Sequence, residues 1–483
     1  MMEHISYLRE CLRCREVFLI FHLLAPFLSL WNLFTVFGMP VMLLCCGAIL
    51  SRGIRIGRIL HPGRFRHTLM EGCAGTGTSP WKAMTMALAG TLGVGNITGV
   101  SAAVLQGGVG AVFWMWIGAL FSMAVKYGEV ALAVRYHRKT PDGKRCGGMM
   151  YVIRDGLTKK LGNTTAYCLG GFFSLLCLAN ALITGTIVQS NAAADVLYPF
   201  PEWASGLLLA ILTVAALLYG IEKVGDITLR LVPGMTAVFI LLSLWIILGN
   251  LALIPSILRQ IVTEAFSFRA LGGGITGIGI RGFFRLLGGS GFGCSLRYGI
   301  TRGIFSNEAG CGTSPSAHAS AETRSPFHQG CMGIFEVICD TLLLCTMTAL
   351  VLCIGDRYYG FLTAGGNNLT LRTYQAFGGD IVYGIMAGMV MLFAYATILA
   401  QMYYGSTAIG YFTVRKWSGA VYAVITLICI ITGAILPSGI MWGLADFIIT
   451  LMTCINTAVL FGMRREIMET VPDEIRLKTE KDR

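Results

Sequence analysis

The chain has 483 residues and a net charge of +12, with 55% hydrophobic and only 13% charged residues. That charged share is about half of the share usual in soluble domains, which leaves no room for a large soluble domain. The basic residues crowd a few loops between long apolar runs, a pattern that indicates membrane topology rather than a nucleic-acid partner. We therefore expect an all-α, multi-pass protein of the plasma membrane, which in bacteria is the inner membrane.

Apolar runs predict eleven membrane spans. The first begins at Val17 or His22 and ends at Leu50. The ten core spans lie at 81–105, 110–134, 165–195, 205–220, 230–250, 295–320, 330–354, 380–408, 418–436 and 440–463. The predicted units are an extra N-terminal helix at 1–50, a basic cytoplasmic loop at 51–80, a first five-helix repeat at 81–250, a Gly-rich external or re-entrant segment at 251–294, a second five-helix repeat at 295–463 and a charged cytoplasmic tail at 464–483.

Two of the ten core spans, the first and the sixth, are interrupted by glycine. The interruptions are AGTLGVGNITGV, Ala89–Val100, and FSNEAGCGTSP, Phe305–Pro315. Interrupted segments in matching positions of two halves indicate a transporter built from repeats. Because each half has five spans, an odd number, the halves must enter the membrane from opposite sides and form inverted repeats. The basic loops at 51–80 and 135–161 then both face the cytoplasm.

The glycines expected to break these helices are Gly93, Gly95, Gly310 and Gly312. Backbone groups freed by a break are tolerated at membrane depth only inside protein or along a cavity. Freed carbonyls suit a hard cation such as Na⁺, and freed N–H groups at the positive end of a half-helix suit a carboxylate. Glycine permits unusual backbone angles and the close approach of a ligand. These features favour a small zwitterion bound beside a cation, although glycine also allows close helix packing.

The sixteen cysteines do not indicate a metal site. Most lie singly in apolar runs, where cysteine acts as a small hydrophobe. Cys11 and Cys14 form one CxxC pair, and a zinc site would need a second pair. We find no nucleophile–base or metal-ligand spacing either. The sequence therefore predicts a protein that is not an enzyme, has no catalytic residue and carries no cofactor, with Na⁺ as the only metal ion.

Ionisable residues inside the predicted spans are costly and are expected to face interior partners. Glu308, in the second interruption, is expected to bind a cation, carry a proton or pair with a base such as Arg302. Glu129 lies three residues after Lys126, so the two could form an ion pair along one helix.

Further polar residues lie in the predicted spans. Glu336 and Asp340 have i,i+4 spacing and would repel each other unless one is protonated or both meet hydrogen-bond donors. His318 is expected to be a hydrogen-bonded core residue, with pH sensing as the alternative. The span at 165–195 is unusually polar and is expected to line the cavity. Its polar residues are Asn180, Thr184, Gln189, Asn191 and Asp195.

Four stretches that run through both halves carry a family resemblance. They are GVGNITGVSAAVLQGGVGAVFWMW at 93–116, KYGEVALAVRYH at 126–137, RGIFSNEAGCGTSPSAHASAET at 302–323 and DTLLLCTMTAL at 340–350. With weaker support from IVQSN at 187–191 and MYYG at 402–405, they resemble the alanine/glycine:cation symporter family, the family of the sodium:alanine symporters. The resemblance implies a LeuT-type fold of two inverted five-helix repeats, here with one extra N-terminal helix.

AGTLGVGN is also similar to the broken first core helix of the sodium-coupled neurotransmitter symporters. This similarity implies carbonyls of Ala89 and Leu92 near Na⁺, and N–H groups of Val94 and Gly95 near the substrate carboxylate. The whole predicted cation-binding set is Ala89, Thr91, Leu92 and Thr397. The whole predicted substrate-binding set is Val94, Gly95, Asn96, Gln189, Phe305, Ser306, Asn307 and Gln401.

The eighth core span departs from the family pattern. It reads FAYATILAQMYYGS where the family usually has a sequence like FAFSTIIGWSYYGE. Ala396 stands in place of a serine and removes one candidate cation ligand, which favours altered or absent sodium coupling as an alternative. Gln401 stands in place of a tryptophan, so it is expected to leave room in the pocket and to add a polar group. Ser406 stands in place of a glutamate.

The function predicted from these features is symport of a small neutral amino acid with Na⁺ by a monomer in the lipid bilayer, through alternating access. The expected substrate is alanine or glycine, and Gln401 extends the expectation to serine or glutamine. The alternatives are an H⁺-coupled or uncoupled amino-acid transporter, a channel, and a sensor that binds amino acid without moving it. A channel would need a symmetric pore-lining ring, whereas this chain carries an internal duplication.

Overall fold

The computed structural model describes residues 38–70, 77–140, 143, 145–197, 200–220, 223–266, 292–364, 368–413, 415–436 and 438–476. Over these residues it is built of helices, with one short hairpin formed by β1 (Arg138–Lys139) and β2 (Arg145–Cys146). The predictions for Cys11 and Cys14, for the start of the first span and for most of the Gly-rich segment lie outside the described residues.

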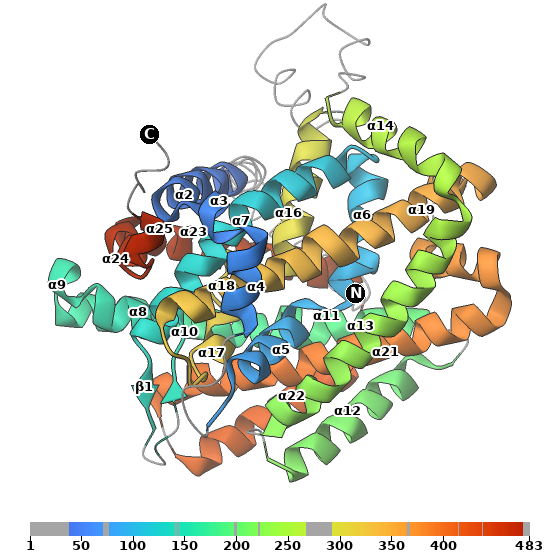
Figure 1. Ribbon diagram of the computed structural model, residues 1–483. Coiled ribbons are helices and arrows are strands. Elements are labelled where there is room, and N and C mark those ends of the chain that lie inside the picture. Colours follow the sequence, from blue (N-terminus) through green and yellow to red (C-terminus); the bar gives the residue numbers. More distant parts are fainter. Residues whose placement is uncertain are drawn as a thin grey trace, which may run out of the picture.

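Figure 1 shows the helices in chain order. The first half comprises α2 (Met39–Ile54), α3 (Ile56–Ile59), α4 (Pro62–Met70), α5 (Pro80–Thr91), η2 (Val94–Asn96), α6 (Thr98–Gly107), α7 (Ala111–Arg135), α8 (Met149–Gly156), α9 (Thr158–Leu161), α10 (Asn163–Leu182), η3 (Ile183–Ile187), α11 (Val188–Val196), α12 (Glu202–Leu218) and α13 (Val224–Gly249). The rest comprises η5 (Leu251–Leu253), α14 (Ile254–Ala265), α16 (Phe292–Asn307), α17 (Pro315–His318), α18 (Pro326–Val337), η7 (Ile338–Cys345), α19 (Thr346–Tyr359), α20 (Phe361–Ala364), α21 (Leu369–Phe412), α22 (Lys416–Ile435), α23 (Ser438–Gly462), α24 (Arg464–Glu469) and α25 (Asp473–Arg476). Here η2 and η5 are 3₁₀ turns, whereas η3 and η7 are π-helical.

Seven continuous helical stretches of the described residues are long and apolar enough to cross a membrane. They are Ala111–Arg135, Asn163–Val196, Val224–Gly249, Pro326–Tyr359, Leu369–Phe412, Trp417–Ile435 and Met441–Gly462. α2 and α12 are shorter apolar helices. Two further predicted spans are interrupted and therefore consist of shorter pieces, α5 with α6 and α16 with α17. The chain is thus a multi-pass membrane protein, while the number of eleven spans stays a prediction.

Local sequence signals explain where two helices near the site begin. The Ser79 hydroxyl accepts a hydrogen bond from the Lys82 N–H at 3.1 Å, and the Ser325 hydroxyl accepts one from the His328 N–H at 3.2 Å. Each serine is followed by proline, whose missing N–H costs nothing in the first turn of a helix. These Ser–Pro pairs therefore start α5 and α18.

The long helix α21 bends at Gly379, which has φ 69° and ψ −166°. The predicted span at 380–408 begins at this bend. The residues before it form an additional helical arm from Leu369, and this arm contacts the first broken helix. The Thr370 hydroxyl, for example, donates to the Ile97 carbonyl at 3.1 Å.

Helices at matching positions of the two halves pack on each other. α7 lies against α18, α10 against α21, and α12 against α22. The second, third and fourth core spans of each half thus pair with their counterparts, as expected of inverted repeats. We call α5, η2, α6, α7, α16, α17, α18, η7 and α19 the bundle, and α10, η3, α11, α12, α21 and α22 the scaffold. Both broken helices belong to the bundle, and α5 and α21 bring the bundle and the scaffold into contact.

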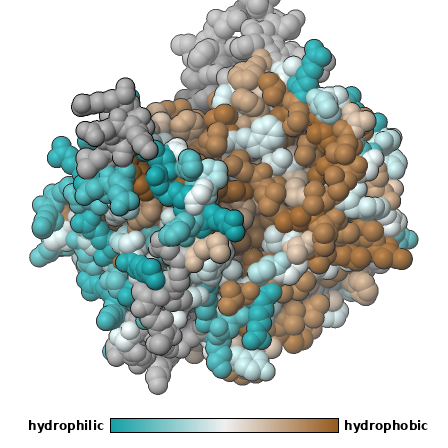
Figure 2. All heavy atoms as spheres, viewed as in Figure 1, coloured by the Kyte–Doolittle hydropathy of each residue, from teal (hydrophilic) through white to brown (hydrophobic). Residues whose placement is uncertain are grey.

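The molecular surface is divided into apolar and polar regions. Figure 2 shows hydrophobic side chains gathered over α13, and hydrophilic ones on the opposite side around α8, α9 and α24. The exposed apolar residues of α13 include Leu229, Val238, Leu241, Trp245 and Leu248. In a protein that crosses the membrane, a continuous apolar surface of this kind faces lipid.

Candidate functional site

The first break begins where the hydrogen bonding of α5 changes partners. The Gly93 N–H bonds the Thr91 carbonyl at 2.8 Å, and the Asn96 N–H bonds the Gly93 carbonyl at 3.3 Å. The carbonyls of Ala89 and Leu92 therefore lose the helical donors that lie four residues further on. Both residues are fully buried, so bulk water does not replace these donors.

The Thr397 hydroxyl, on scaffold helix α21, meets both freed carbonyls. It lies 3.0 Å from the Ala89 carbonyl oxygen and 3.5 Å from that of Leu92. It also lies 3.0 Å from the Phe393 carbonyl of its own helix. The structure thus brings together three of the four predicted cation-binding residues as a buried group of uncharged oxygen atoms.

The fourth predicted residue, Thr91, does not join this group. Its hydroxyl donates to the Leu88 carbonyl at 3.2 Å within α5, and its carbonyl accepts from Gly93. Ala396 is fully buried beside Thr397 and offers no side-chain oxygen. The oxygen group therefore depends on Thr397 and on the backbone.

Gln189, on scaffold helix α11, reaches the same break. Its amide oxygen accepts from the Val94 N–H at 3.1 Å, and its amide nitrogen donates to the Thr184 carbonyl at 3.3 Å. A Cβ atom on Gly93 would lie 2.8 Å from this Gln189 oxygen and 2.7 Å from the Thr397 hydroxyl oxygen. Gly93 has φ −115°, so glycine is needed here for space rather than for its backbone freedom.

Aromatic rings close the other side of the first break. A Cβ atom on Gly95 would lie 3.3 Å from the Phe305 ring. Phe305 is 6% exposed and packs on Trp442 with ring centroids 4.9 Å apart. Of the two residues whose N–H groups are predicted to hold a carboxylate, Val94 therefore bonds the Gln189 amide and Gly95 lies close to the Phe305 ring.

The second break is shorter than the predicted Phe305–Pro315, because α16 stays helical through Asn307. Glu308, Gly310 and Gly312 then adopt left-handed φ angles of 50°, 88° and 75°. Such angles suit glycine and are unfavourable for other residues, so Glu308 is held against its backbone preference. The Asn307 amide oxygen accepts the backbone N–H two residues on at 2.9 Å and closes the turn.

Glu308 is 4% exposed and faces neutral groups. Its carboxylate accepts from the Gln401 amide at 2.6 Å and from the Thr313 hydroxyl. Arg302 instead pairs with Asp446 at 3.3 Å, so the alternative of an Arg302–Glu308 pair is wrong. Among the described residues Glu308 forms no ion pair, which leaves cation binding and proton carriage open.

Gln401 is fully buried between Glu308 and Gly185, where a Cβ atom would overlap the Gln401 side chain. The sequence predicts that Gln401 leaves free space in the pocket, but in the structure its own side chain fills that space. Its amide oxygen has no hydrogen-bond partner among the described residues. The Asn180 amide oxygen and the Thr184 hydroxyl, on the adjoining helical segment, are also buried and have no partner in the described part of the chain. Polar atoms here are available to a ligand.

Asp340, in the π-helical segment η7, joins both broken helices. It accepts from the Asn96 amide at 2.6 Å, the Ser306 hydroxyl at 2.8 Å and the Thr341 hydroxyl at 2.7 Å. The Asn307 amide also donates to the Thr341 hydroxyl at 3.0 Å. The structure therefore places Asn96, Ser306 and Asn307, all predicted to face the substrate, in contact with η7.

A second buried network joins α7, α17 and α18. The Lys126 ammonium lies 2.7 Å from the Ser314 hydroxyl and 3.2 Å from the Glu336 carboxylate. His318 bonds the other Glu336 oxygen at 3.0 Å and the Gln329 amide at 2.8 Å. All five side chains are fully buried. His318 is thus a hydrogen-bonded core residue.

Two predictions about acidic residues can now be compared with the geometry. The Lys126–Glu129 pair is wrong, because Lys126 pairs with Glu336 and Glu129 accepts from the Asn456 amide of α23. Glu336 and Asp340 both meet hydrogen-bond donors, which is one of the two predicted ways to relieve their mutual repulsion. Glu129 and Asp340 contact neighbours that lie far away in the sequence, and helical spacing does not reveal such contacts.

The polar residues of the span at 165–195 have two different roles. Gln189 reaches the first break, whereas the Asn191 amide donates to the Gly433 and Leu436 carbonyls and links α11 to α22. The π-segment η3 within this span is a feature that sequence reasoning missed. The Thr186 hydroxyl bonds the carbonyl five residues back at 2.8 Å, which fits the wider turn.

The fold and the site together define a class of protein. Two discontinuous helices in matching positions of two halves present freed backbone groups to scaffold side chains, which is the design of a secondary transporter with a LeuT-type fold. The chain belongs to the sodium:alanine symporter family, whose sequence profile matches residues 25–482.

Relatives of known sequence agree with this membership. The chain is 31% identical to an uncharacterized transporter of Haemophilus influenzae, over 91% of this chain and 93% of the relative. It is 35% identical to the sodium/alanine symporter AgcS of Methanococcus maripaludis, over 76% and 78%. It is 30% identical to the probable sodium/glutamine symporter GlnT of Bacillus subtilis, over 91% and 88%.

A solved structure supports the fold. The chain resembles a Na⁺-coupled sialic acid symporter with a TM-score of 0.50 and 12% sequence identity, over 90% of this chain and 86% of the other. At this identity the likeness concerns the fold alone.

Proposed function

We propose that the protein carries a small neutral amino acid across the membrane together with Na⁺ by alternating access. The observation that carries the proposal is the oxygen group formed by the Thr397 hydroxyl and the freed carbonyls of Ala89 and Leu92. Uncharged oxygen donors suit a hard cation. Within the described residues no three His, Cys, Asp or Glu side chains gather as a metal site, so the available donors favour Na⁺ over a transition metal.

The position of this group supports coupling of the cation to a conformational change. Thr397, Gln189 and Gln401 of the scaffold contact Ala89, Val94 and Glu308 of the bundle, respectively. A ligand bound among these residues interacts differently with open and closed arrangements of the two parts. It can shift the equilibrium by that difference in affinity. We expect the substrate carboxylate to displace the Gln189 oxygen from the Val94 N–H and to lie beside Na⁺.

The energy available to such a symporter is adequate. One charge that crosses a potential of about 100 mV provides about 2.3 kcal/mol. A tenfold Na⁺ gradient adds about 1.4 kcal/mol. One Na⁺ per substrate could therefore drive an accumulation of a few hundred-fold.

The polar groups around Gln401 support a particular substrate class. The unpartnered oxygen atoms of Gln401, Asn180 and Thr184 favour a neutral substrate with a hydrogen-bonding side chain, such as serine or glutamine, beside alanine. Gln401→Leu keeps a similar side-chain volume and removes the amide group that would hydrogen-bond such a substrate. We expect it to lower glutamine uptake relative to alanine uptake by about tenfold. An unchanged ratio in competition assays would exclude a role of Gln401 in selectivity.

A binding screen tests substrate and coupling together. Purified protein is heated with each of the common amino acids, in NaCl and in matched choline chloride. We expect neutral amino acids to raise the unfolding temperature in Na⁺ and to have a much smaller effect in choline. Equal shifts in the two salts would reject Na⁺-coupled binding, and the absence of any shift would reject the substrate class.

Proton coupling is a second candidate, because the hydrogen-bond donors that the buried Glu308 carboxylate meets among the described residues are neutral. Such a group is stable when it is protonated or when it lies next to a cation. If protons drive transport through Glu308, uptake should follow a pH gradient in the absence of Na⁺, and Glu308→Gln should abolish that uptake. Loss of only Na⁺-driven uptake in this variant would assign Glu308 to the cation pathway instead.

A further inference from the structure

The segment that leads into the first broken helix is strongly basic. Residues 38–70 contain five arginines and two histidines and no aspartate or glutamate. Three of the arginines, Arg52, Arg55 and Arg58, lie at the junction of α2 and α3. Positive charge on the cytoplasmic side of a span is common and can serve topology alone. The local geometry at this junction indicates a role beyond topology.

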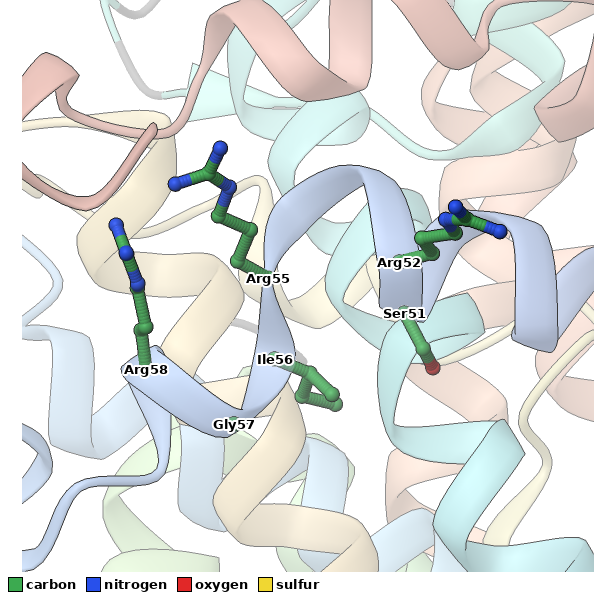
Figure 3. A pocket seen from close by; sticks show the side chains of 6 residues that line it. All are labelled: Ser51, Arg52, Arg55, Ile56, Gly57 and Arg58. Carbon is green, nitrogen blue, oxygen red and sulfur yellow. The ribbon is translucent and has the colours of Figure 1, made fainter. Parts of the chain in front are cut away.

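The junction forms a shallow surface pocket of about 450 Å³, lined by Ser51, Arg52, Arg55, Ile56, Gly57 and Arg58. Figure 3 shows the Arg55 and Arg58 side chains extending side by side from the junction, and Arg52 extending from the last turn of α2 in a different direction. Arg58 donates to the Ile475 carbonyl at 3.0 Å, which places α25 next to the pocket. Among the described residues, Arg52 and Arg55 form no side-chain hydrogen bond or ion pair. Within the part of the chain that the structure describes, two positive charges in the pocket therefore have no acidic partner.

The backbone at Arg55 is a second observation. Arg55 has left-handed angles, φ 54° and ψ 55°, and forms the C-cap of α2. Glycine usually occupies this position of a helix end, since other side chains are strained there. Gly53 and Gly57 lie on either side, yet the left-handed position itself is an arginine. Residues in strained conformations are held there by the surrounding structure, and they cluster at functional sites such as ligand clamps.

An apolar stripe leads along α2 to this pocket. Val41, Cys45 and Ile49 are exposed at helical spacing on one face, and exposed Arg52 follows one turn later. The opposite face of α2 packs on α7 and α23. In a membrane-spanning helix the exposed stripe faces lipid tails, and its basic end lies at the level of the lipid headgroups.

We propose that this pocket binds the headgroup of an anionic phospholipid on the cytoplasmic side. The phosphate would contact the Arg55 guanidinium group, and the exposed Arg52 side chain, which extends in another direction in Figure 3, would turn toward it, while an acyl chain would follow Val41, Cys45 and Ile49. Basic pockets at the cytoplasmic ends of spans are the usual type of site for such headgroups. This proposal does not depend on which solute the protein carries.

The test measures lipid binding directly on the full chain in a neutral detergent. Phosphatidylglycerol or phosphatidylcholine is added, and bound lipid is counted by native mass spectrometry. We expect phosphatidylglycerol to bind and the Arg52→Gln/Arg55→Gln variant to lose affinity by about fivefold per arginine, which corresponds to about 1 kcal/mol each. The matched control is Arg64→Gln/Arg66→Gln, which removes the same charge from the same segment outside the pocket. It should bind normally.

A second variant separates folding from lipid binding. Arg55→Gly relieves the left-handed backbone, so it should keep or raise the unfolding temperature without lipid and still lose about fivefold in affinity for phosphatidylglycerol. The proposal is overturned by equal losses in the two double variants, which would show a diffuse effect of charge. It is also overturned by equal binding of the two lipids, or by full competition from glycerol phosphate, which would show a site for free phosphate.

Discussion

At the scale of single residues, glycines in the two breaks serve different needs. Gly310 and Gly312 have left-handed φ angles, whereas Gly93 has an ordinary backbone and is needed because two side chains approach it closely. The sequence predicted that both segments break. It could not reveal which physical need applies, because that depends on Thr397 and Gln189 from distant helices.

Gly93→Ala should impair transport without preventing insertion. Its Cβ atom would press on the Thr397 and Gln189 side chains, both of which lie at the proposed site. We expect uptake efficiency to fall at least about tenfold, since small misplacements in a binding site are costly. Gly99→Ala is the matched control, because a Cβ atom there would meet no described residue of another element within 4 Å. Normal uptake by the Gly93 variant would argue against this site.

Thr397→Val should weaken Na⁺ dependence selectively. Valine keeps the shape of threonine and removes the only side-chain oxygen of the proposed cation group. A hydrogen bond or contact to a charged partner contributes about 1.5–3 kcal/mol, so the Na⁺ concentration for half-maximal uptake should rise about tenfold or more. Thr407→Val, on the same helix, removes a hydroxyl whose one hydrogen bond among the described residues is to the Tyr403 carbonyl. It should leave the Na⁺ dependence as it is.

At the scale of elements, the sequence predicted helix positions better than helix interiors. The Ser–Pro starts of α5 and α18 and the two glycine breaks have local signals. The π-segments η3 and η7 were not predicted, because a widened turn arises from tertiary contacts and is not favoured by residue type. For the same reason Asp340 was recognised as an acidic residue with a close acidic neighbour, but not as the point where Asn96 and Ser306 meet.

The Lys126–Glu336 pair should stabilise the bundle as a unit. Removing one partner leaves an uncompensated buried charge, so Lys126→Met should cost about 3–5 kcal/mol of stability. The double variant Lys126→Met/Glu336→Gln should be less unstable than the sum of the single variants. Unfolding temperatures in detergent measure both effects.

The control for the Lys126 and Glu336 variants is Lys82→Met. Lys82 pairs with Asp226 at 2.6 Å, but both side chains are partly exposed, so the cost should be about 0–1 kcal/mol. If the Lys126 and Lys82 variants lose equal stability, the buried network does not hold the bundle together.

At the scale of the whole molecule, the packing of α7 on α18, α10 on α21 and α12 on α22 relates the two halves as counterparts. The sequence predicted the repeats from two glycine breaks in matching positions, and their inverted orientation from the odd number of spans per half. It could not predict how Gln189, Thr397 and Gln401 meet the bundle, because those contacts join residues about 90 to 310 positions apart. Family membership agrees with the fold, and the contacts between bundle and scaffold are the basis of the proposed coupling.

The most direct test of this account is amino-acid uptake into proteoliposomes in which the Na⁺ gradient and the membrane potential are set independently. The account predicts accumulation of a neutral amino acid that requires Na⁺ outside. Uptake should increase when the interior is made negative, and it should cease when both gradients are absent. Amino-acid influx that is indifferent to Na⁺ and to voltage would contradict it.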